Sequence, residues 1–427
     1  MLGYFLKQPR TGFFTLLLVF AALSANQASA SSLQKTNTAP LKLGIDVLEE
    51  NGFALLKGKR VGLLTHPAGV NRYGVSTLHI LSTSKSVSLT ALYGPEHGIY
   101  GDEEAGAHIE NRRDSRTGLP IYSLYGKFRK PTPAMLQPID TLVIDLQDIG
   151  VRSYTFVSCM KLALEACFEN NVEVIILDRP NPLGGLKVDG PMIEKEWISY
   201  VGAFPTPYVH GLTIGELARM AVSRPGILEL SDNQRKNGKL SVITMSGWKR
   251  YMSWPATGLK WTAASPNIPD FQSVAGYAMT GLGAQIGSFN HGIGTEYPFR
   301  ILSCEGLDNR ELIKKLQKRN IPGITIVPES YRNGNGAYVR ITDWSKWRPT
   351  ELSFHMMQIS SELTNNTPFK AATEGDANFF NKLVGSSSWW KEISQKGAQS
   401  NLSGFIQAWE RQAKQFQVQS RRYWLYD

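Results

Sequence analysis

Short apolar segments rich in Val, Ile and Leu alternate with segments of helical periodicity over residues 59–247. The expected strands cover residues 60–65, 87–94, 119–125, 141–148, 172–179 and 240–245. One helix is expected at 154–170, and another begins at Thr213, which forms a Thr-x-x-Glu capping box with Glu216. Such alternation is typical of parallel βαβ units. The sequence therefore predicts an α/β fold with a Rossmann-like parallel sheet that carries helices on its faces.

The alternation stops after residue 270, where glycine and aromatic residues become more frequent. The elements expected beyond this point are helices at 309–319 and 351–363, strands at 324–328 and 337–341, and a closing segment at 422–427. The 427 residues also exceed the roughly 250 to 300 at which a single core stops growing. We therefore predict a Rossmann-like catalytic domain at 44–270 and a smaller α+β domain at 271–427.

The first thirty residues have the composition of a Sec-type signal peptide. Lys7 and Arg10 precede the apolar run 13–23, and small residues at 28–30 provide a cleavage site. The run is shorter than the roughly 18 residues that a membrane helix needs, and no cysteine follows it to carry a lipid. We expect a protein exported to a Gram-negative periplasm, or secreted, with a linker at 31–43 and no stable membrane insertion after cleavage.

The formal net charge of +10 is compatible with an anionic partner such as nucleic acid, anionic lipid or the cell wall. The basic residues are scattered, however, with short clusters only at 57–60, 314–319 and 421–422, which favours an ordinary solvated surface. Export argues further against nucleic acid. The three cysteines predict no disulfide framework, because Cys159 and Cys167 lie too far apart along the expected helix.

Charged residues gather where the expected strands end. Ligands of parallel sheets bind outside the carboxyl ends of the strands, because the following loops converge there. The polar residues at these exits are Glu96, Asp148, Arg152, Asp178, Arg179 and Asn181. Two interpretations remain open: they form a ligand site, or the aspartates pair with Arg152 and Arg179 and join the loops. Asp145 lies opposite the apolar face of its strand and is expected to be buried.

Several common sites lack their sequence motifs. The first strand is followed by Thr-His-Pro-Ala-Gly-Val rather than Gly-x-Gly-x-x-Gly, so a dinucleotide cofactor is not expected. No Gly-x-Ser-x-Gly sequence is present, and no cysteine lies near a candidate base. His66, His97, His108 and His210 lack the spacing of metal ligands, so neither a metal nor another cofactor is expected.

Carboxylates and arginines remain as the chemistry of the expected site. Glycoside hydrolysis needs two carboxyl groups, one to protonate the leaving oxygen and one to activate water or attack the anomeric carbon. Glu96 is the candidate acid, because Pro95 and Gly98 fix the turn around it. The planar guanidinium of arginine suits a sugar that carries a carboxylate, such as the lactyl ether of N-acetylmuramic acid.

Five motifs in a fixed order are the most specific feature of the chain. They are Gly-Pro-Glu-His-Gly at 94–98, Thr-Gly-Leu-Pro with Ser-Leu-Tyr-Gly at 117–126, Asp-Leu-Gln-Asp-Ile-Gly-Val-Arg-Ser-Tyr at 145–154, Asp-Arg-Pro-Asn-Pro at 178–182 and His-Gly-Leu-Thr at 210–213. This set resembles the NamZ-type exo-β-N-acetylmuramidases, formerly the DUF1343 proteins and now glycoside hydrolase family 171. The resemblance implies a Rossmann-like domain, a smaller domain and an active-site cleft between them. It also implies release of terminal β-1,4-linked N-acetylmuramic acid from peptidoglycan fragments.

The resemblance implies roles for individual residues. Glu96 is then the leading catalytic carboxylate and Asp148 its partner. The motif residues expected to bind substrate are His97, Arg152, Tyr154, Asp178, Arg179, Asn181 and His210. Gln285 and Ile293 depart from the family pattern, which has a carboxylate and an arginine at these places. Glu296 is therefore also expected at the substrate, with nearby His291 as the alternative substitute.

The departures leave two other interpretations open. One is a non-catalytic or altered-specificity binder of cell-wall glycan fragments. The residues that would stack on its sugars, unless they pack in the core, are Trp248, Trp254 and Trp261. The other is a nucleotide-dependent oxidoreductase, which would contain bound NAD or flavin after purification.

Overall fold

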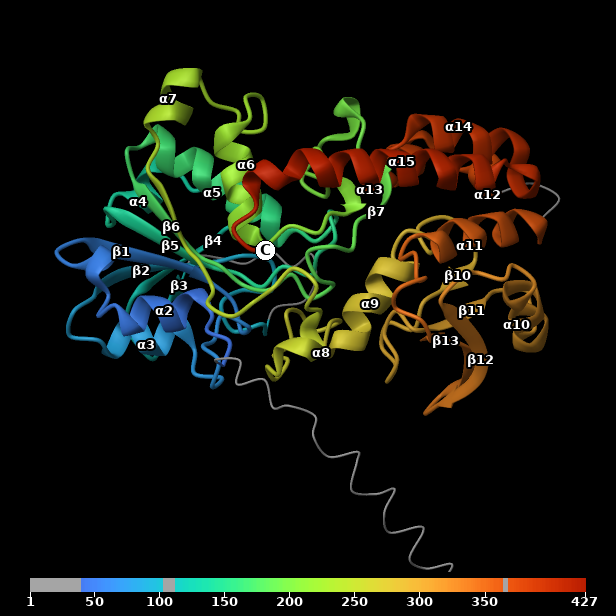
Figure 1. The fold of residues 1–427 in the computed structure, drawn as a ribbon, viewed down its shortest axis with the longest axis horizontal. Coiled ribbons are helices and arrows are strands. Elements are labelled where there is room, and N and C mark those ends of the chain that lie inside the picture. The colour runs from blue at the N-terminus through green and yellow to red at the C-terminus, as the bar shows by residue number, and fades with distance from the viewer. Residues whose placement is uncertain (1–39, 103–111, 364–367) are drawn as a thin grey trace, which may run out of the picture. The chain divides into compact units, whose positions relative to one another are not determined.

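The computed structural model describes residues 40–102, 112–363 and 368–427, so the predicted signal peptide and His108 lie outside the described residues. A sheet of seven strands, in the order β3-β4-β2-β1-β5-β6-β9, organises the first part of the chain (Figure 1). The strands are β1 (Arg60–Thr65), β2 (Ser88–Gly94), β3 (Arg112–Arg113), β4 (Pro120–Ser123), β5 (Thr141–Asp145), β6 (Glu173–Leu177) and β9 (Leu240–Ile243). Neighbours run parallel except β3 and β4, which confirms the predicted α/β sheet.

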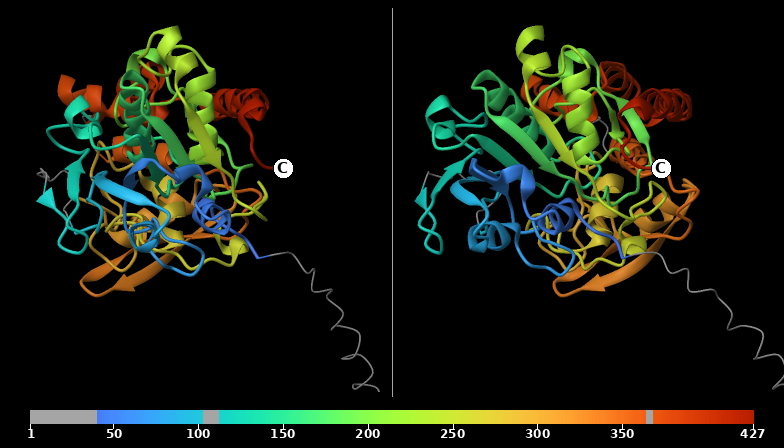
Figure 2. Two further views of the ribbon diagram at one scale, coloured as in Figure 1. Left: turned by 90° about the vertical axis from the view of Figure 1, so that its left-hand side faces the viewer. Right: turned by 60° about the vertical axis from the view of Figure 1, so that its left-hand side comes forward.

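Apolar residues on both faces of the strands explain why helices cover both sides of this sheet. The helices of this part are α2 (Gly44–Glu50), α3 (Thr77–Thr83), α4 (Pro133–Leu136), α5 (Phe156–Glu169), α6 (Ile214–Ser223), α7 (Asp232–Asn237) and α8 (Trp254–Thr257). In β5, Leu142 and Ile144 enter the buried cluster beneath α5 and α6, whereas Val143 enters the one beneath α2 and α3. Figures 1 and 2 show these two helix pairs on opposite faces. Strands buried on both faces are apolar throughout, as parallel sheets require.

Turn and capping residues fix the edges of these elements. Thr213 Oγ1 accepts a hydrogen bond from Glu216 N at 3.2 Å, and Thr213 N donates to Glu216 Oε2 at 3.0 Å, so the predicted capping box is confirmed. Two short strands, β7 (Asp189–Met192) and β8 (Pro207–Val209), pair beside the large sheet. Single 3₁₀ turns occupy η1 (Ala54–Leu56), η2 (Lys195–Trp197), η3 (Gly397–Gln399) and η4 (Arg421–Tyr423).

A smaller antiparallel sheet, ordered β10-β11-β13-β12, follows in the second part of the chain. Its strands are β10 (Phe289–Asn290), β11 (Ile301–Cys304), β12 (Ile324–Tyr331) and β13 (Gly334–Ile341). The helices are α9 (Phe271–Thr280), α10 (Asn309–Gln317), α11 (Glu351–Glu362), α12 (Pro368–Ala371), α13 (Glu374–Val384), α14 (Ser387–Lys396) and α15 (Leu402–Ser420). The predicted second sheet is confirmed, while the domain boundary at 270 stays a prediction.

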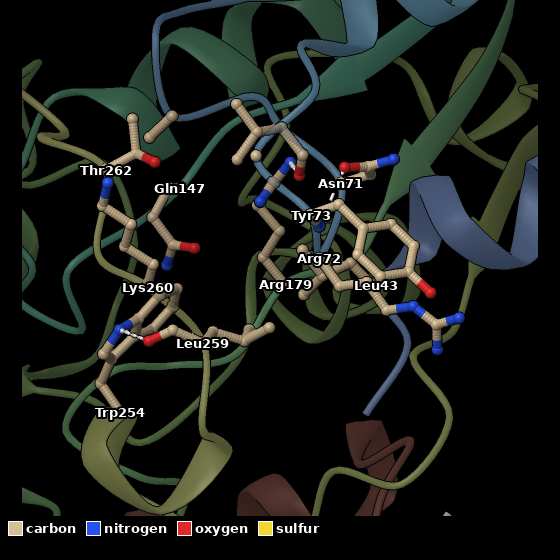
Figure 3. A pocket seen from close by; sticks show the side chains of 13 residues that line it. Leu43, Asn71, Arg72, Tyr73, Gln147, Arg179, Trp254, Leu259, Lys260 and Thr262 are labelled. Atoms are coloured by element: carbon tan, nitrogen blue, oxygen red, sulfur yellow. Dashed lines mark hydrogen bonds between the residues drawn. The ribbon is translucent and has the colours of Figure 1, made fainter. Parts of the chain in front are cut away.

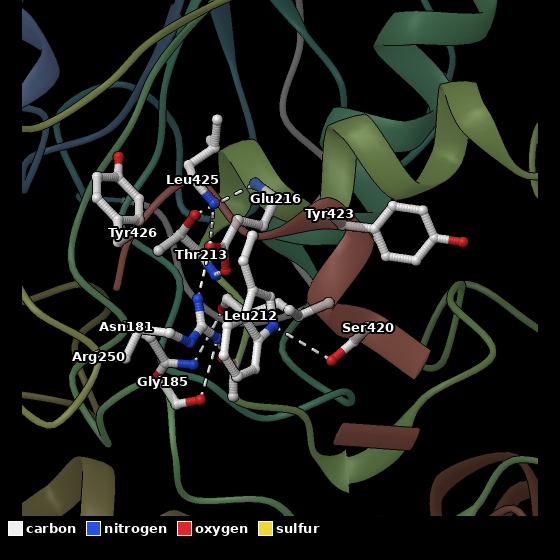
Figure 4. A network of polar contacts seen from close by, with 12 residues as sticks. Asn181, Gly185, Leu212, Thr213, Glu216, Arg250, Ser420, Tyr423, Leu425 and Tyr426 are labelled. Carbon is white, nitrogen blue, oxygen red and sulfur yellow. Dashed lines mark hydrogen bonds and ion pairs between the residues drawn. The ribbon is translucent and has the colours of Figure 1, made fainter. Parts of the chain in front are cut away.

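The last residues of the chain return to the large sheet (Figure 4). Leu425 N donates to Glu216 Oε1 at 2.9 Å, and Arg250 Nη1 donates to the same oxygen at 2.6 Å. Tyr426 packs into the buried cluster beneath α2, and its hydroxyl donates to Asp178 Oδ2 at 2.6 Å. The sequence predicts this segment as part of the second domain, and the structure packs it against the large sheet.

None of the helices in the described part of the chain combines the length and the apolar character needed to cross a membrane.

Candidate functional site

The order of the large sheet brings the predicted strand exits close together. β1 lies between β2 and β5, and β6 follows on the other side of β5. Glu96 comes directly after β2, Asp148 after β5 and Arg179 after β6. The chain moves from β1 to β2 and then returns to β5 across β1. This reversal opens a crevice between the carboxyl ends of β1 and β5, where doubly wound sheets bind ligands.

Glu96 occupies a tight turn at the end of β2. Gly98 N donates to Pro95 O at 3.0 Å, and His97 adopts a left-handed φ of 70°, which is uncommon for a residue other than glycine. Glu96 Oε2 accepts a hydrogen bond from Thr155 Oγ1 at 2.7 Å, and the side chain stays partly exposed. Thr155 precedes α5 but makes no side-chain cap, so its hydroxyl serves Glu96 instead. Glu96 is therefore both oriented and accessible.

Four tyrosines lie close enough to Glu96 for its carboxylate to raise their pKa values. They are Tyr125, Tyr154, Tyr200 and Tyr277. Burial is the main cause of each raised pKa, and the Glu96 charge adds to it. Tyr277 comes from α9, and its hydroxyl lies 3.1 Å from Ser153 Oγ. Protonated phenols offer hydrogen-bond donors that suit a sugar, and Tyr125, Tyr200 and Tyr277 are partly exposed whereas Tyr154 is buried.

Asp148 folds back on its own loop. Its Oδ2 accepts a hydrogen bond from Gly150 N at 2.8 Å and lies 3.2 Å from His210 Nε2. His210 Nδ1 accepts a backbone N–H at 3.1 Å, which leaves the ring proton on Nε2, and this nitrogen has no hydrogen-bond partner in the described structure. Asp148 Oδ1 is buried and has no hydrogen-bond partner among the described residues. After burial, Asp148 and Glu96 both raise the pKa of Tyr154, so this phenol is close to both predicted catalytic groups.

His66 is a neutral neighbour of this cluster. Burial, and to a smaller extent the charge of Arg179, lowers the pKa of His66 to about 3. His66 Nε2 accepts a hydrogen bond from Gln147 N at 2.9 Å, and the ring meets the edge of Phe156 at 4.7 Å. A fixed, uncharged imidazole supports the loop after β5 and is not an imidazolium acid at neutral pH.

Arg152, predicted to bind substrate, braces the structure instead. Its side chain is 1% exposed. Nη1 donates to Pro191 O at 2.9 Å and Thr206 O at 2.8 Å, while Nη2 donates to Leu383 O at 3.0 Å and Val384 O at 2.9 Å. Each terminal nitrogen carries two protons, so both are saturated. No terminal donor remains for a sugar carboxylate.

Arg179 is also held within the protein. Its Nη2 donates to Asp145 Oδ2 at 2.9 Å and to Val70 O at 2.6 Å, and its Nε faces Asp145 Oδ1. Asp145 is 0% exposed, so its predicted burial is confirmed. Arg179 therefore pairs with an aspartate and joins two loops, as the alternative interpretation expects. Its partner, however, is Asp145 rather than Asp178.

Asp178 and Asn181 have mainly structural contacts as well. Asp178 accepts hydrogen bonds from Gly215 N at 2.9 Å and Thr213 Oγ1 at 2.8 Å, which ties it to the start of α6. Asn181 Nδ2 donates to Leu212 O at 3.0 Å. The structure therefore does not bring either side chain to Glu96 as a free ligand-binding group.

The second part of the chain supplies Tyr277, whereas a substrate contact of Glu296 stays a prediction. Glu296 Oε1 lies 3.8 Å from exposed Arg332 Nε. Gln285 donates to a carbonyl oxygen at the end of α9 at 2.6 Å, and Ile293 is 45% exposed. Where the family pattern has a carboxylate, Gln285 thus makes a contact at a helix end. Where the pattern has an arginine, Ile293 is an exposed apolar side chain.

Arg129, which is not among the residues predicted at the strand exits, lies beside the candidate site. The guanidinium carbon of Arg129 is 4.2 Å from the ring centre of Tyr200 and 5.8 Å from that of Tyr125. Arg129 is exposed, and no described carboxylate lies within ion-pair distance of it. Its signal in the sequence is the basic run Lys127–Lys130, directly after the Ser-Leu-Tyr-Gly motif.

Two of the three tryptophans considered for sugar stacking are buried. Trp248 is 2% exposed and meets Tyr426 at 5.0 Å, while Trp254 is 6% exposed and meets Trp261 at 4.8 Å. Trp248 and Trp254 therefore pack mainly in the protein interior.

Across residues 40–102, 112–363 and 368–427, no group of three His, Cys, Asp or Glu side chains converges as metal ligands.

Comparisons with known proteins give the family. A model of the N-terminal part of the exo-β-N-acetylmuramidase NamZ matches residues 61–272, and a model of its C-terminal part matches residues 275–426. The chain is 35% identical over 424 residues to the peptidoglycan β-N-acetylmuramidase NamZ of Bacillus subtilis, across 97% of this chain and 98% of that protein. This chain belongs to the NamZ family. The resemblance seen in the motifs is thereby confirmed.

Solved structures support the NamZ-family fold. One DUF1343 family protein of Bacteroides fragilis superimposes with a TM-score of 0.81 at 38% identity, covering 91% of this chain and 99% of that one. A second DUF1343 family protein of the same organism gives a TM-score of 0.69 at 25% identity, with the same coverage of 91% and 99%.

Proposed function

We propose that this protein is an exo-acting glycoside hydrolase that releases terminal β-1,4-linked N-acetylmuramic acid from peptidoglycan fragments. Similarity to NamZ along nearly the whole chain supports this reaction. The observation that carries it at residue level is Glu96, a partly exposed carboxylate held by Thr155 at the end of β2. The tyrosines around it provide a surface for a sugar ring.

Glu96 is the general acid of the proposed reaction. With Oε2 held by Thr155, its carboxyl group protonates the glycosidic oxygen while the bond to the anomeric carbon breaks. Asp148 is the second catalytic carboxylate, because its Oδ1 has no hydrogen-bond partner in the described structure and Asp148 acts on the same phenol as Glu96, that of Tyr154. The hydrogen bond from Gly150 N orients Asp148, and His210 Nε2 lies 3.2 Å from its Oδ2.

Arg129 takes the role first expected of Arg152 and Arg179, whose donors are largely used within the protein. It stacks on Tyr200 beside the Glu96 cluster and has no described carboxylate partner. The guanidinium is therefore available to bind an anion beside the sugar-binding surface. The lactyl carboxylate of N-acetylmuramic acid is such an anion, and N-acetylglucosamine has no lactyl carboxylate.

The decisive experiment replaces the proposed acid. Glu96→Gln keeps the hydrogen-bond geometry but loses the proton donor, so kcat on a chromogenic N-acetylmuramide should fall by about 10² to 10⁴. Glu49→Gln, at an exposed glutamate at the end of α2, is the matched control and should keep wild-type kcat. Equal activity of the wild type and Glu96→Gln would remove Glu96 from the mechanism.

The sugar preference tests Arg129 separately. The ratio of kcat/KM for the chromogenic N-acetylmuramide over the N-acetylglucosaminide should drop about tenfold in Arg129→Gln, because a charge-assisted contact to the lactyl carboxylate is lost. Arg332→Gln, whose side chain is 83% exposed, is the control and should leave the ratio unchanged. An unchanged ratio in Arg129→Gln would show that the carboxylate is recognised elsewhere.

Export belongs to the same proposal. The first thirty residues have signal-peptide composition, and peptidoglycan fragments occur in the bacterial envelope. Cell fractionation should find the processed chain in the periplasm or medium, beginning near Ser31. Unprocessed protein in the cytoplasm would contradict this localisation.

An altered-specificity or non-catalytic glycan binder is the second candidate function. It is favoured by Ile293, which is 45% exposed where the family resemblance implies an arginine. Product analysis after prolonged incubation with muropeptides separates the two: released N-acetylmuramic acid supports the hydrolase, and saturable binding without any product supports the binder.

A further inference from the structure

A groove beside the small sheet is separate from the crevice pocket at the ends of β1 and β5 that Figure 3 shows. The groove contains about 860 Å³ of space, part of it open to solvent, and lies between α9 and the end of β13 (Figure 1). Ala275 and Met279 of α9 line it, whereas Tyr277, which lies close to Glu96, is about 200° around the helix from both. The groove is therefore on the opposite side of α9 from the candidate site.

The groove lies where β11 no longer covers the edge of β13. β11 begins at Ile301, which is opposite Tyr338, whereas β13 continues to Ile341. The chain that precedes β11 turns away at Phe299, which adopts a left-handed φ of 63°. The last residues of β13 therefore have no neighbouring strand on this side in the described structure, and these residues line the groove.

Backbone groups on this side of β13 are available for pairing. Val339 N donates to Arg300 O at 2.8 Å towards β11, whereas Thr342 N donates to Gly323 O at 2.9 Å towards β12. Because antiparallel ladders alternate in this way, Ile341 directs its N–H and C=O to the β11 side. Ile341 N has no hydrogen-bond acceptor there among the described residues. An extended peptide beside β13 would supply one, as when a strand adds to the edge of a sheet.

The groove is lined by two arginines and by no Asp or Glu. Arg300 is 8% exposed, and its Nη2 donates to Asp270 Oδ2 at 3.1 Å, so its charge is neutralised. Arg300 Nη1 forms no hydrogen bond with a described group, which suits an uncharged carbonyl oxygen. Arg340 is exposed and forms neither an ion pair nor a hydrogen bond among the described residues. Since opposite charges on neighbouring strands stabilise pairing, an acidic side chain is favoured beside Arg340.

The alternation along β13 sets the pattern of apolar residues in the ligand. Val339 is buried and Ile341 packs against the buried cluster, whereas Arg340 between them is exposed. Phe271 and Trp344, whose ring centres lie 6.0 Å apart, extend the apolar lining of the groove. A strand beside β13 shares this alternation, so its apolar side chains lie on the face of Val339 and its acidic side chains on the face of Arg340.

We propose that this groove binds an extended segment of a partner protein as an additional strand beside the end of β13, with apolar side chains on the Ile341 face and an acidic side chain beside Arg340. The site is additional to the glycosidase reaction and does not require Glu96. The probe is the peptide Val-Glu-Val-Glu-Val, acetylated and amidated so that only its glutamates carry charge. The peptide Val-Lys-Val-Lys-Val has the same pattern with the opposite charge.

Isothermal titration calorimetry on the full mature chain tests the proposal. The glutamate peptide should bind saturably with a Kd of about 1 mM or tighter, and the lysine peptide about tenfold more weakly. The residue opposite Ile341 shares its apolar face and exchanges backbone hydrogen bonds with it. N-methylation of the central valine should therefore abolish binding. N-methylation of a glutamate, whose nitrogen points away from β13, is the matched control and should preserve it.

A charge reversal in the protein locates the peptide. Arg340→Glu should bind the lysine peptide more tightly than the glutamate peptide, because the cross-strand charge pair is restored with opposite signs. Arg310→Glu, at an exposed arginine on α10, is the control and should keep the wild-type preference. Both variants should keep wild-type kcat on the chromogenic N-acetylmuramide, which also shows that they are folded.

Four results would overturn the proposal. Absence of saturable binding by the glutamate peptide removes the site, and equal binding of the lysine peptide by the wild type removes recognition of charge. Equal effects of the two N-methylations would mean that the edge of β13 does not pair with the peptide. An unchanged preference in Arg340→Glu would place the peptide elsewhere on the protein.

Discussion

At the residue scale, Asp178 lies in an unusual environment for a carboxyl group. It is 0% exposed, and it accepts hydrogen bonds from Thr213 Oγ1 at 2.8 Å, Gly215 N at 2.9 Å and Tyr426 Oη at 2.6 Å. Burial, together with the charge of Glu216, raises the pKa of Asp178 to about 6 despite these donors, and no cation among the described residues forms an ion pair with it. Its charge at neutral pH is therefore a cost to the folded state.

This charge predicts a pH dependence of stability. Since the pKa is raised from 3.8 to about 6 on folding, the folded protein holds more protons than the unfolded chain between these values. The stabilising effect of protonated Asp178 is complete below about pH 4 and is lost as the pH rises through about 6. Asp178→Asn removes the titration. Its stability relative to the wild type, from urea unfolding, should therefore improve as the pH increases across this window.

Asp140→Asn is the control for that experiment. Hydrogen bonds from Arg60 lower the pKa of Asp140, so the contribution of Asp140 is lost as the pH falls rather than as it rises. The two variants should thus differ from the wild type with opposite pH slopes. A stability difference for Asp178→Asn that does not change with pH would show that Asp178 does not titrate in this window.

At the residue scale, the sequence predicts which side chains stand at strand exits but not what they contact. Glu96 follows from the turn residues around it, whereas Thr155, which holds Glu96, has no motif of its own. Arg152 looks like a ligand-binding arginine in the sequence, yet its acceptors include Leu383 and Val384, more than two hundred positions away. Partner choice depends on tertiary packing, which strand patterns do not contain.

At the element scale, strands are easier to predict than the C-terminal helices. Every residue of β5 is buried, so its apolar run is continuous and distinct from its surroundings. Helix α15 has 19 residues, of which only Leu402, Trp409, Ala413, Phe416 and Ser420 are buried. Its apolar stripe is therefore sparse, and the sequence analysis predicts no helix there. Helix α9 is similarly obscured by its one glycine, although Gly276 is needed because a Cβ there would lie 2.7 Å from Phe299 O.

Arg152 joins such elements, and this predicts a large effect on stability. Arg152→Met keeps the aliphatic stem but removes four hydrogen bonds, which leaves the carbonyl groups of Pro191, Thr206, Leu383 and Val384 without this donor. The free energy of unfolding should fall by about 3 kcal/mol or more. Arg310→Met, at an exposed arginine on α10, should change it by less than about 0.5 kcal/mol.

The same variant separates bracing from substrate binding. Because Arg152 has no free terminal donor, the folded fraction of Arg152→Met should keep the wild-type preference for N-acetylmuramides over N-acetylglucosaminides. Urea unfolding gives the stability and kcat/KM ratios give the preference. Unchanged stability together with a lost preference would make Arg152 a substrate ligand.

At the scale of the whole molecule, the C-terminal residues pack against the part of the chain that contains the large sheet. Helix α15 packs against β7, and the tail beyond it reaches Glu216 and Asp178. Arg219 Nη1 adds hydrogen bonds to Tyr423 O at 3.2 Å and Trp424 O at 3.0 Å. The last residues of the chain therefore complete hydrogen bonds of α6 and of Asp178 after β6, so both sheets should unfold together.

Tyr426→Phe tests this coupling with the loss of one oxygen atom. The ring still fills the cluster beneath α2, but Asp178 loses a donor and Met245 N loses the acceptor that lies 3.0 Å away. Unsatisfied groups of this kind cost about 1 to 3 kcal/mol each. Calorimetry of the wild type should show one transition, and the variant should move that single transition down by a few degrees. Tyr251→Phe, at a tyrosine that is 74% exposed, should leave it in place. Two transitions, of which the variant moves only one, would mean that the sheets unfold independently and that the tail stabilises the first sheet alone.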